Sequence, residues 1–330
     1  MIHQPFLLLW APVAEKLYDD TKQFLKTHEI TWYLAIFMMW ENNPSAVYVR
    51  KKVAYAEKLG LEGRVFEYNY ADFLQQNKLE GETMSQHWDW DANDAFFEHI
   101  LNRIHQCNND SQCLWIIIQL PLPVELMQYK KQLLNAVTPE KDVDCLGEKL
   151  LTISQVGTGE LQVAPATPAA TLHLLDYYYR GSGHDNDGQL FDQETGKFLK
   201  PHVVSVLWES DLIGKPLIQM LKDRGATVHG FNEFSDQNQM RSICQSSDSI
   251  FAATGKLHLV DQQFVRDDQT QIVVDIGRGM LNGKAAGDVN TLAVQDKIAA
   301  ITPVPWGIWP VTVASIFWNM CLLWEWKSMK

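Results

Sequence analysis

The run Ile116-Ile117-Ile118-Gln119-Leu120-Pro121-Leu122-Pro123 constrains the fold more than any other stretch of the chain. Three consecutive isoleucines predict a strand that is buried on both faces, as in a parallel sheet. Because proline has no N–H to donate to a ladder, the strand must end before Pro121. Gln119 is then a polar side chain at the carboxyl end of an apolar strand, which is where ligands bind in open α/β sheets. The alternative interpretation is a glutamine that bonds only to nearby backbone.

Apolar runs of strand length alternate with helical patterns along the chain. The first series consists of the runs 32–39, 65–70 and 116–118. The second series consists of the runs 203–207, 226–231, 250–253 and 272–275. This alternation predicts an α/β protein with two domains, the second containing a Rossmann-like parallel sheet. The second series lacks the G-x-G-x-x-G fingerprint, so its pattern alone is a weak indication of a dinucleotide site.

The composition argues against several classes of function. A formal net charge of −12 argues against a nucleic-acid-binding protein, because no basic field would attract phosphates. Five cysteines without a CxxC motif predict neither a disulfide framework nor a metal site. They fit a reducing compartment, so we expect a cytoplasmic protein. No apolar span reaches about 18 residues, so we expect no membrane-spanning helix.

Two pairs of polar residues stand out in the first series. Tyr48 and Lys52 are four residues apart on a helix predicted to start at Ser45, so both point to one face. The alternative is a surface lysine beside a half-buried tyrosine. Asp142 and Asp144 flank one residue, which puts both carboxylates on one side if the segment is extended. The alternative for this pair is a solvated turn.

Prolines mark two further boundaries. Thr167 and Pro168 predict the start of a helix, with Thr167 as the N-cap and Pro168 in the first helical position. The segment 301–312 contains three prolines, which predicts a stiff loop rather than a helix or a central strand. Such a loop suits a wall against a flat ligand; the alternative is a plain connection between domains.

Together and in this order, these segments resemble the methylenetetrahydrofolate dehydrogenase/cyclohydrolase (FolD) family. The resemblance extends from about Pro12 to Asn319. Its most specific pieces are Tyr48-Val49-Arg50-Lys51-Lys52, Gln119-Leu120-Pro121-Leu122-Pro123, Lys141-Asp142-Val143-Asp144, Thr167-Pro168, Gly214-Lys215-Pro216, Gly287-Asp288-Val289, and 301–305 with Pro310 and Thr312.

The resemblance implies two domains with a cleft between them. Residues 1–165 and 303–330 would form a folate-binding catalytic domain, and residues 166–302 a Rossmann-like domain for a nicotinamide cofactor, NADP or NAD. The implied activity is oxidation of 5,10-methylenetetrahydrofolate to methenyltetrahydrofolate, followed by hydrolysis to 10-formyltetrahydrofolate, in one-carbon metabolism. The implied partners are tetrahydrofolate derivatives and a second copy of the chain in a homodimer.

The resemblance also implies roles for single residues. Lys52 would act on the one-carbon unit and its attacking water, while Gln119 would hold Lys52 and bond to the reacting oxygen. Tyr48 would cover the pterin, and Asp144 would accept hydrogen bonds from it. The implied catalytic residues are Lys52, Gln119, Tyr48 and Asp144. The implied substrate-binding residues are Tyr48, Gln119, Leu120, Pro121, Asp144, Pro303, Pro305, Trp306 and Gly307. The implied cofactor-binding residues are Trp208, Glu209, Ser210, Gly214, Pro216, Glu233, Thr254, Gly255 and Arg278.

The chain departs from the family pattern chiefly at glycines. Tryptophan replaces the usual glycine at Trp10, Trp40, Trp115, Trp208, Trp306 and Trp309. An indole in a glycine turn opposes close approach of a ligand to the backbone. One interpretation is a diverged paralogue; the other is that these residues are glycines, read as tryptophan under the wrong codon table. Repetition of one swap at unrelated positions favours the second, and mass spectrometry of the peptides decides between them.

Four further departures are single changes. Glu209 stands where the family often has arginine, and Glu233 lies near the expected 2′-phosphate, so both disfavour NADP. Arg278 replaces an apolar residue beside the nicotinamide, and Cys145 replaces another glycine. The altered cofactor turn leaves two alternatives to the bifunctional enzyme: a cyclohydrolase alone, or a catalytically inactive folate- or partner-binding protein. The segments 80–93 and 181–196 look like insertions.

Overall fold

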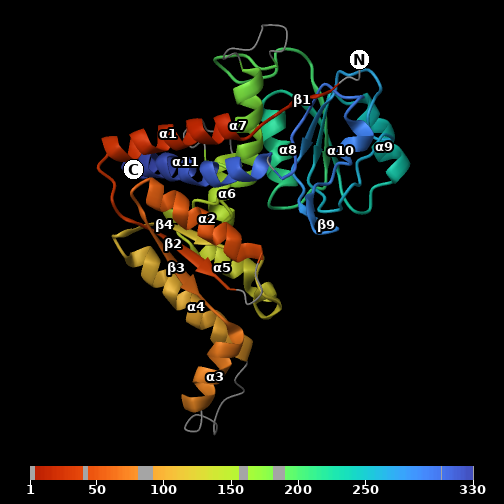
Figure 1. The fold of residues 1–330 in the computed structure, drawn as a ribbon. Helices are drawn as coiled ribbons and strands as arrows, with labels where there is room; N and C mark the ends of the chain where they lie inside the picture. The colour runs from red at the N-terminus through yellow and green to blue at the C-terminus, as the bar shows by residue number, and fades with distance from the viewer. Residues whose placement is uncertain are drawn as a thin grey trace. The chain divides into compact units, whose positions relative to one another are not determined.

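The computed structural model describes residues 4–39, 44–80, 92–155, 163–180, 190–305 and 307–329, and the chain divides into two compact units. Unit 1 comprises Met1–Leu17 and Ala164–Ser315, and unit 2 comprises Tyr18–Val163 and Ile316–Lys330. Each unit combines a parallel sheet with helices, so the predicted α/β class is confirmed (Figure 1). Trp40, Trp306 and most of both predicted insertions, at 81–91 and 181–189, lie outside the described residues.

The units differ from the predicted domains at residues 1–17, 164–165 and 303–315, all of which belong to unit 1. The N-terminal segment adds a strand to the larger sheet, because β1 (Phe6–Leu7) pairs in parallel with β11 (Ala300–Ile301). The hydroxyl of Tyr178 also donates to the carbonyl of Leu9 at 2.9 Å. These contacts form over a long sequence separation and left no local pattern in the sequence.

The sheet of unit 2 has three parallel strands in the order β3-β2-β4. They are β2 (Tyr33–Met38), β3 (Glu62–Glu67) and β4 (Cys113–Ile118). Every residue of β2 and β4 is buried, as predicted for the isoleucine run. The helices of this unit are α2 (Pro44–Lys58), α3 (Tyr70–Glu80), α4 (Ala92–Asn109), α5 (Lys130–Ala136) and α6 (Glu148–Gln155). The strand order reverses between β2 and β4, so their carboxyl ends border a topological switch point.

The sheet of unit 1 has six parallel strands in the order β1-β11-β8-β7-β5-β6. Its other strands are β5 (Val203–Leu207), β6 (Thr227–Phe231), β7 (Ser249–Ala252) and β8 (Ile272–Asp275). Its helices and its hairpin are α7 (Ala166–Tyr179), α8 (Gly214–Asp223), α9 (Gln237–Ser246), α10 (Thr291–Val294), and β9 (Gly279–Leu281) with β10 (Lys284–Ala286). This is a doubly wound order with its switch point between β5 and β7.

Two predictions made from prolines are wrong in part. Helix α11 (Ile308–Ser328) already includes Pro310, although we expected a loop as far as residue 312. Proline is tolerated in the first helical turn, because the N–H groups there have no partner within the helix. Helix α7 has Pro165 as its N-cap, so Thr167 lies inside the helix rather than capping it. Helix α1 (Ala11–Thr27) agrees with the apolar pattern of its sequence.

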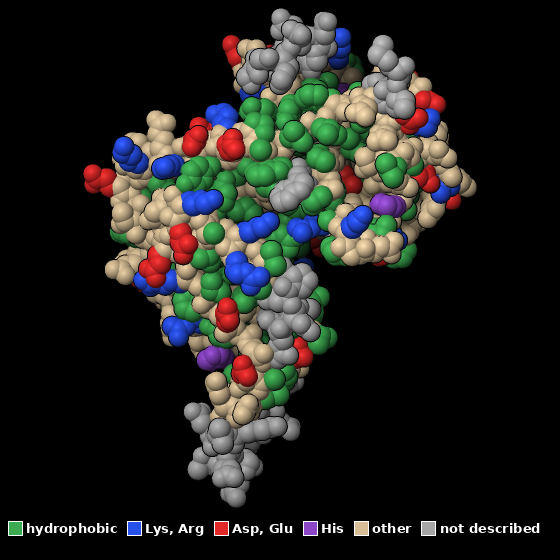
Figure 2. Space-filling view, in the orientation of Figure 1, with side chains coloured by type: hydrophobic (Ala, Val, Ile, Leu, Met, Phe, Trp, Pro, Cys, Tyr) green, Lys and Arg blue, Asp and Glu red, His purple; other side chains and the backbone are tan. Residues whose placement is uncertain are grey.

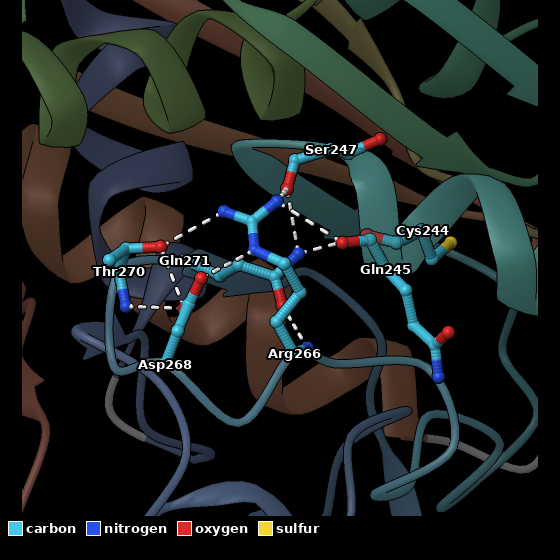
Figure 3. A network of polar contacts seen from close by, with 7 residues as sticks. All are labelled: Cys244, Gln245, Ser247, Arg266, Asp268, Thr270 and Gln271. Atoms are coloured by element: carbon cyan, nitrogen blue, oxygen red, sulfur yellow. Dashed lines mark hydrogen bonds and ion pairs between the residues drawn. The ribbon is translucent and has the colours of Figure 1, made fainter.

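Side chains donate hydrogen bonds to the carbonyl groups at the carboxyl ends of two helices. In unit 2, the Lys141 ammonium donates to the carbonyls of Cys107, Asn108 and Asp110 at 2.7–2.9 Å, which closes α4. Burial lowers the pKa of this lysine. In unit 1, Arg266 and Gln271 donate to carbonyls at the end of α9 (Figure 3). Such carbonyls otherwise lack partners, so both arrangements stabilise the helix ends.

Acidic and basic side chains are interspersed on the face drawn in Figure 2, with hydrophobic side chains between them. The chain has a net charge of −12, but the acidic side chains on this face do not form one continuous area. Within the described ranges, no helix is both long and apolar enough to cross a membrane.

Replacing Lys141 with methionine should lower the free energy of unfolding by about 3–5 kcal/mol, because three carbonyl groups lose their donor. The matched control is Lys131→Met, which removes an exposed lysine paired with Glu148 and should cost under about 1 kcal/mol. Urea denaturation of both variants measures the difference. Equal losses in the two variants would contradict the capping role of Lys141.

Candidate active site

Lys52 lies on the apolar face of α2. The buried residues of this helix include Val49 and Ala56, and Leu59 follows it at the same spacing; Lys52 occupies the same stripe with 7% of its surface exposed. A surface lysine at this position, the alternative left open by the sequence, is therefore wrong. A buried ammonium requires hydrogen-bond partners or a counter-charge.

Both kinds of partner are present in unit 2. The Lys52 ammonium donates to the side-chain oxygen of Gln119 at 3.1 Å, and it lies 3.6 Å from a carboxylate oxygen of Asp144. Gln119 follows β4 directly, and its backbone N–H donates to the Phe37 carbonyl on β2. Its side-chain amide also donates to the Leu120 carbonyl at 2.7 Å. Gln119 bonds to nearby backbone and also holds Lys52, so the alternative of a glutamine that bonds only to nearby backbone is wrong.

The turn that carries Asp144 is built on Asp142. One carboxylate oxygen of Asp142 accepts the backbone N–H groups of Leu146 and Gly147 at 3.0 and 2.8 Å, and Asp142 also forms a parallel bridge with Ile116 of β4. Burial raises the pKa of Asp142 to about 7. The two aspartates therefore have different roles: Asp142 stabilises the turn, while Asp144 faces the Lys52 ammonium. The solvated turn left open by the sequence is wrong, because Lys141 and Asp142 are both buried.

Two features of the turn could not be inferred from local sequence. Asn319, on the part of α11 that belongs to unit 2, donates to the Val143 carbonyl at 2.9 Å and is itself buried. Cys145 has a φ of 54°, a conformation that favours glycine, and it is one of the positions where the family has glycine. The resulting site combines an ammonium, an amide and a carboxylate, with Asp144 15% exposed at its side chain.

The remaining predicted substrate-binding residues are distributed over both units. In unit 2, Tyr48 lies one helical turn before Lys52 and is half-buried, Leu120 is half-buried and Pro121 is exposed. In unit 1, Pro303 and Pro305 are half-buried. Gly307 is buried, and a Cβ there would lie 2.6 Å from the Pro303 carbonyl oxygen, so that turn requires glycine.

The predicted cofactor residues of unit 1 gather at the carboxyl ends of its strands. After β5, Trp208 has a φ of 85°, and its backbone N–H donates to the Phe231 carbonyl at the end of β6. The Trp208 carbonyl packs against the start of α8, where a Cβ on Gly214 would lie 2.0 Å from its oxygen. Ser210 accepts the N–H groups of Ile213 and Gly214 through its hydroxyl. Pro216 follows as the third residue of α8.

The turn after β7 faces the turn after β5 across the switch point. It contains Thr254 and Gly255, and the following Lys256 places its ammonium 4.4 Å from the centre of the Trp208 ring. This cation–π contact joins the two turns, and neither the lysine nor the contact was predicted. Arg278 lies over the ring of Trp309 at 5.7 Å.

Glu209 and Glu233 both lie close to β6: Glu209 packs against the strand, and Glu233 follows its carboxyl end. The Glu209 side chain lies against Gly230 of β6, where a Cβ would lie 2.0 Å from a carboxylate oxygen. Glu233 is exposed two residues beyond the end of β6. In dinucleotide-binding sheets, an acid at this strand end hydrogen-bonds the ribose hydroxyls of NAD. Carboxylates at these two positions would repel a 2′-phosphate bound at the end of β6.

The tryptophans that replace family glycines behave differently from one another. Trp208 has the positive φ that glycine adopts readily. Trp115 is a fully buried core residue of β4, paired with Leu34 of β2 directly after a shift in the register of the two strands. Trp10 is half-buried, and its carbonyl accepts the first N–H groups of α1. Of these three tryptophans, only Trp208 has a strained backbone conformation.

Comparisons with known proteins agree with this geometry. Residues 9–144 match the family model "Tetrahydrofolate dehydrogenase/cyclohydrolase, catalytic domain", and residues 189–328 match its NAD(P)-binding domain. Bifunctional protein FolD of Nitrosomonas eutropha is 30% identical over 93% of this chain and 89% of that protein. The crystal structure of FolD from Campylobacter jejuni has a TM-score of 0.76 at 25% identity, covering 98% of this chain and 99% of that chain.

A more distant structure shows the same fold. FolD of Trypanosoma brucei, complexed with NADP cofactor and inhibitor, has a TM-score of 0.78 at 21% identity and covers 99% of both chains. From the two family models and the relative of N. eutropha it follows that this chain belongs to the tetrahydrofolate dehydrogenase/cyclohydrolase family, whose members are named bifunctional FolD proteins.

Proposed function

We propose that the chain oxidises 5,10-methylenetetrahydrofolate with a nicotinamide cofactor and hydrolyses the methenyl product to 10-formyltetrahydrofolate. The observation that carries the proposal is the buried Lys52 ammonium, held 3.1 Å from Gln119 and 3.6 Å from Asp144 beyond the end of β4. These residue types at these positions are the ones that the family resemblance assigns to the reaction. Their convergence from a helix, a strand end and a turn supports a site rather than a structural ion pair.

In this site the chain's own groups would handle protons and orient the substrate. Hydrolysis adds one water to the methenyl cation and releases one proton, and Lys52 is the amine placed to relay it. Gln119 fixes the direction of the Lys52 ammonium and offers its amide to the reacting oxygen. Asp144 would accept hydrogen bonds from the pterin, a charge-assisted contact. Tyr48 would cover the ring from the adjacent turn of α2.

The carboxyl edge of unit 1 fits a dinucleotide at the switch point between β5 and β7. The start of α8 lies there, with the N–H groups of Gly214 and Lys215 already bonded to Ser210 and no N–H at Pro216. A Cβ at Gly255 would meet nothing within 4 Å, so the turn after β7 leaves room for a ligand. When bound, the nicotinamide would accept the hydride from the methylene carbon. We expect the Trp208 indole, which lies beside Lys256 at this edge, to weaken dinucleotide binding.

We propose NAD rather than NADP as the preferred cofactor, because Glu209 and Glu233 both present carboxylates near β6. We also propose a cytoplasmic location, supported by the free thiols of all five cysteines. A homodimer formed through unit 1 follows from the family resemblance and stays a prediction.

Lys52→Met should reduce hydrolysis by about 100-fold or more, because the site loses its proton-relaying amine. It should also lower the oxidation, because the amine acts on the one-carbon unit that gives up the hydride. The control is Lys51→Met, at an exposed neighbour on the same helix, which should stay within about twofold of wild type. Two absorbance assays on one sample measure reduction of NAD or NADP and decay of methenyltetrahydrofolate. Decay without cofactor reduction by the wild type would identify a cyclohydrolase alone, and two blank assays with folate bound would identify a binding protein.

Glu209→Gln should shift the preference toward NADP by about tenfold, because it removes one charge that repels the 2′-phosphate. The ratio of kcat/KM for NAD and NADP is the measurement. Asp223→Asn, at the far end of α8, is the control, since its carboxylate accepts only a hydrogen bond from Gln219 among the contacts of the described residues. A ratio that moves equally in both variants would refute the specificity role of Glu209.

Trp208→Gly should raise the free energy of unfolding by about 1 kcal/mol, since it relieves a positive φ, and should tighten cofactor binding several-fold. Trp115→Gly should have the opposite sign and cost about 3–5 kcal/mol, because it empties a buried position. Thermal unfolding and cofactor titration measure both effects. Peptide mass spectrometry of the starting protein first establishes that indole is present at residue 208, and glycine there would end the paralogue interpretation.

A further inference from the structure

Two buried carboxylates that the mechanism does not use lie at the carboxyl edge of the unit 1 sheet. Asp275 is the last residue of β8 and is 3% exposed, and Asp288 precedes α10 and is fully buried. Buried carboxylates are costly, so each needs a structural or functional reason. Their hydrogen bonds connect three separate loops on the edge where the dinucleotide is proposed to bind.

Asp288 holds the turn that follows β7. One of its carboxylate oxygens accepts the backbone N–H groups of Thr254 and Gly255, at 2.5 and 3.0 Å. Thr254 and Gly255 are the predicted cofactor residues on this side of the switch point. The other oxygen, Oδ1, is buried without a hydrogen-bond partner among the described residues. All of the hydrogen bonding that the structure gives this side chain is thus directed at one turn.

Asp275 holds Asp288 in turn. Its two carboxylate oxygens accept the backbone N–H groups of Asp288 and Val289, each at 3.0 Å. The backbone of Asp275 is fixed in its own right, because its N–H donates to the Thr302 hydroxyl at 2.7 Å. The contacts therefore run from β8 through Asp275 to Asp288 and on to the turn at Thr254.

Two glycines leave space for the carboxylates. A Cβ at Gly277 would lie 2.0 Å from the carboxyl carbon of Asp288, and a Cβ at Gly287 would lie 1.9 Å from a carboxylate oxygen of Asp275. Real Cβ contacts are never this short, so any other residue would displace the carboxylates. Glycine at these two positions is explained by packing against the acids, and it needs no unusual backbone conformation.

We propose that Asp288 is a positioning residue for dinucleotide binding, which fixes the N–H groups of Thr254 and Gly255 at the switch point, and that Asp275 supports it. The inference rests on the dinucleotide binding proposed above. Asp288 is too deeply buried to touch a ligand, so it acts only through the turn. Burial raises the pKa of both carboxyl groups, that of Asp275 to about 7.

The test compares Asp288→Ala with Asp288→Asn in the full chain. Alanine removes the acceptor, so the affinity for NAD and NADP should fall at least tenfold, and the amides of Thr254 and Gly255 should exchange faster with deuterium. Asparagine keeps a carbonyl oxygen in place and should restore affinity to within about threefold of wild type. Cofactor-free hydrolysis of methenyltetrahydrofolate, which uses residues of unit 2, should stay within twofold in both variants.

Gly277→Ala supplies a second variant that leaves Asp288 itself intact. Its Cβ should push the carboxylate aside and weaken dinucleotide binding in the same direction as Asp288→Ala. Wild-type affinity in Asp288→Ala or in Gly277→Ala would overturn the inference. So would a parallel loss of hydrolysis and affinity, which indicates a role in folding alone. A wild-type chain that binds neither dinucleotide would refute the proposed function itself, a result distinct from failure of the variants.

Discussion

The buried ammonium of Lys52 is the constraint on which the site of unit 2 depends. A charge at 7% exposure is stable only where partners compensate for its lost hydration. Its partners come from distant parts of the sequence, Gln119 at the end of β4 and Asp144 in a turn after α5. The prolines end β4 at Gln119, and the hydrogen bonds of Asp142 shape the turn that carries Asp144. Both features place the partners of the Lys52 ammonium.

In both units, polar side chains bond to the backbone at helix ends and in loops, and the two kinds of contact have different roles. At helix ends, Lys141 and Arg266 cover carbonyl groups that would otherwise lack partners. At the carboxyl edges of the sheets, Asp142 and Asp288 each collect two backbone N–H groups from one turn. A carboxylate that accepts two N–H groups fixes the local backbone more firmly than packing alone, because the bonds are directional. The turns that carry predicted ligand contacts are fixed in this way.

Local sequence was sufficient wherever one segment determined its own structure. The strands at 203–207 and 272–275 and the helix at 237–246 lie where their apolar patterns predicted them. The convergence of Lys52, Gln119 and Asp144 was also predicted, but from the family resemblance, since residues 67 and 25 positions apart leave no periodic signal. Strand β1, the Asn319 contact and the Lys256–Trp208 contact were missed because they form between distant segments. The proline loop was predicted too long because the first helical turn tolerates proline.

The departures from the family pattern affect the residues proposed for oxidation more than those proposed for hydrolysis. Trp208, Glu209 and Glu233 alter the cofactor edge of unit 1, whereas the Lys52 network of unit 2 is intact. The proton relay that hydrolysis needs lies in unit 2, while oxidation also requires a bound nicotinamide. We therefore expect divergence at Trp208 to weaken the oxidation more than the hydrolysis. Asp275 and Asp288 fix the Thr254 turn of this chain, which is hard to reconcile with a chain that has abandoned its dinucleotide, because buried carboxylates without a use are a standing cost to stability.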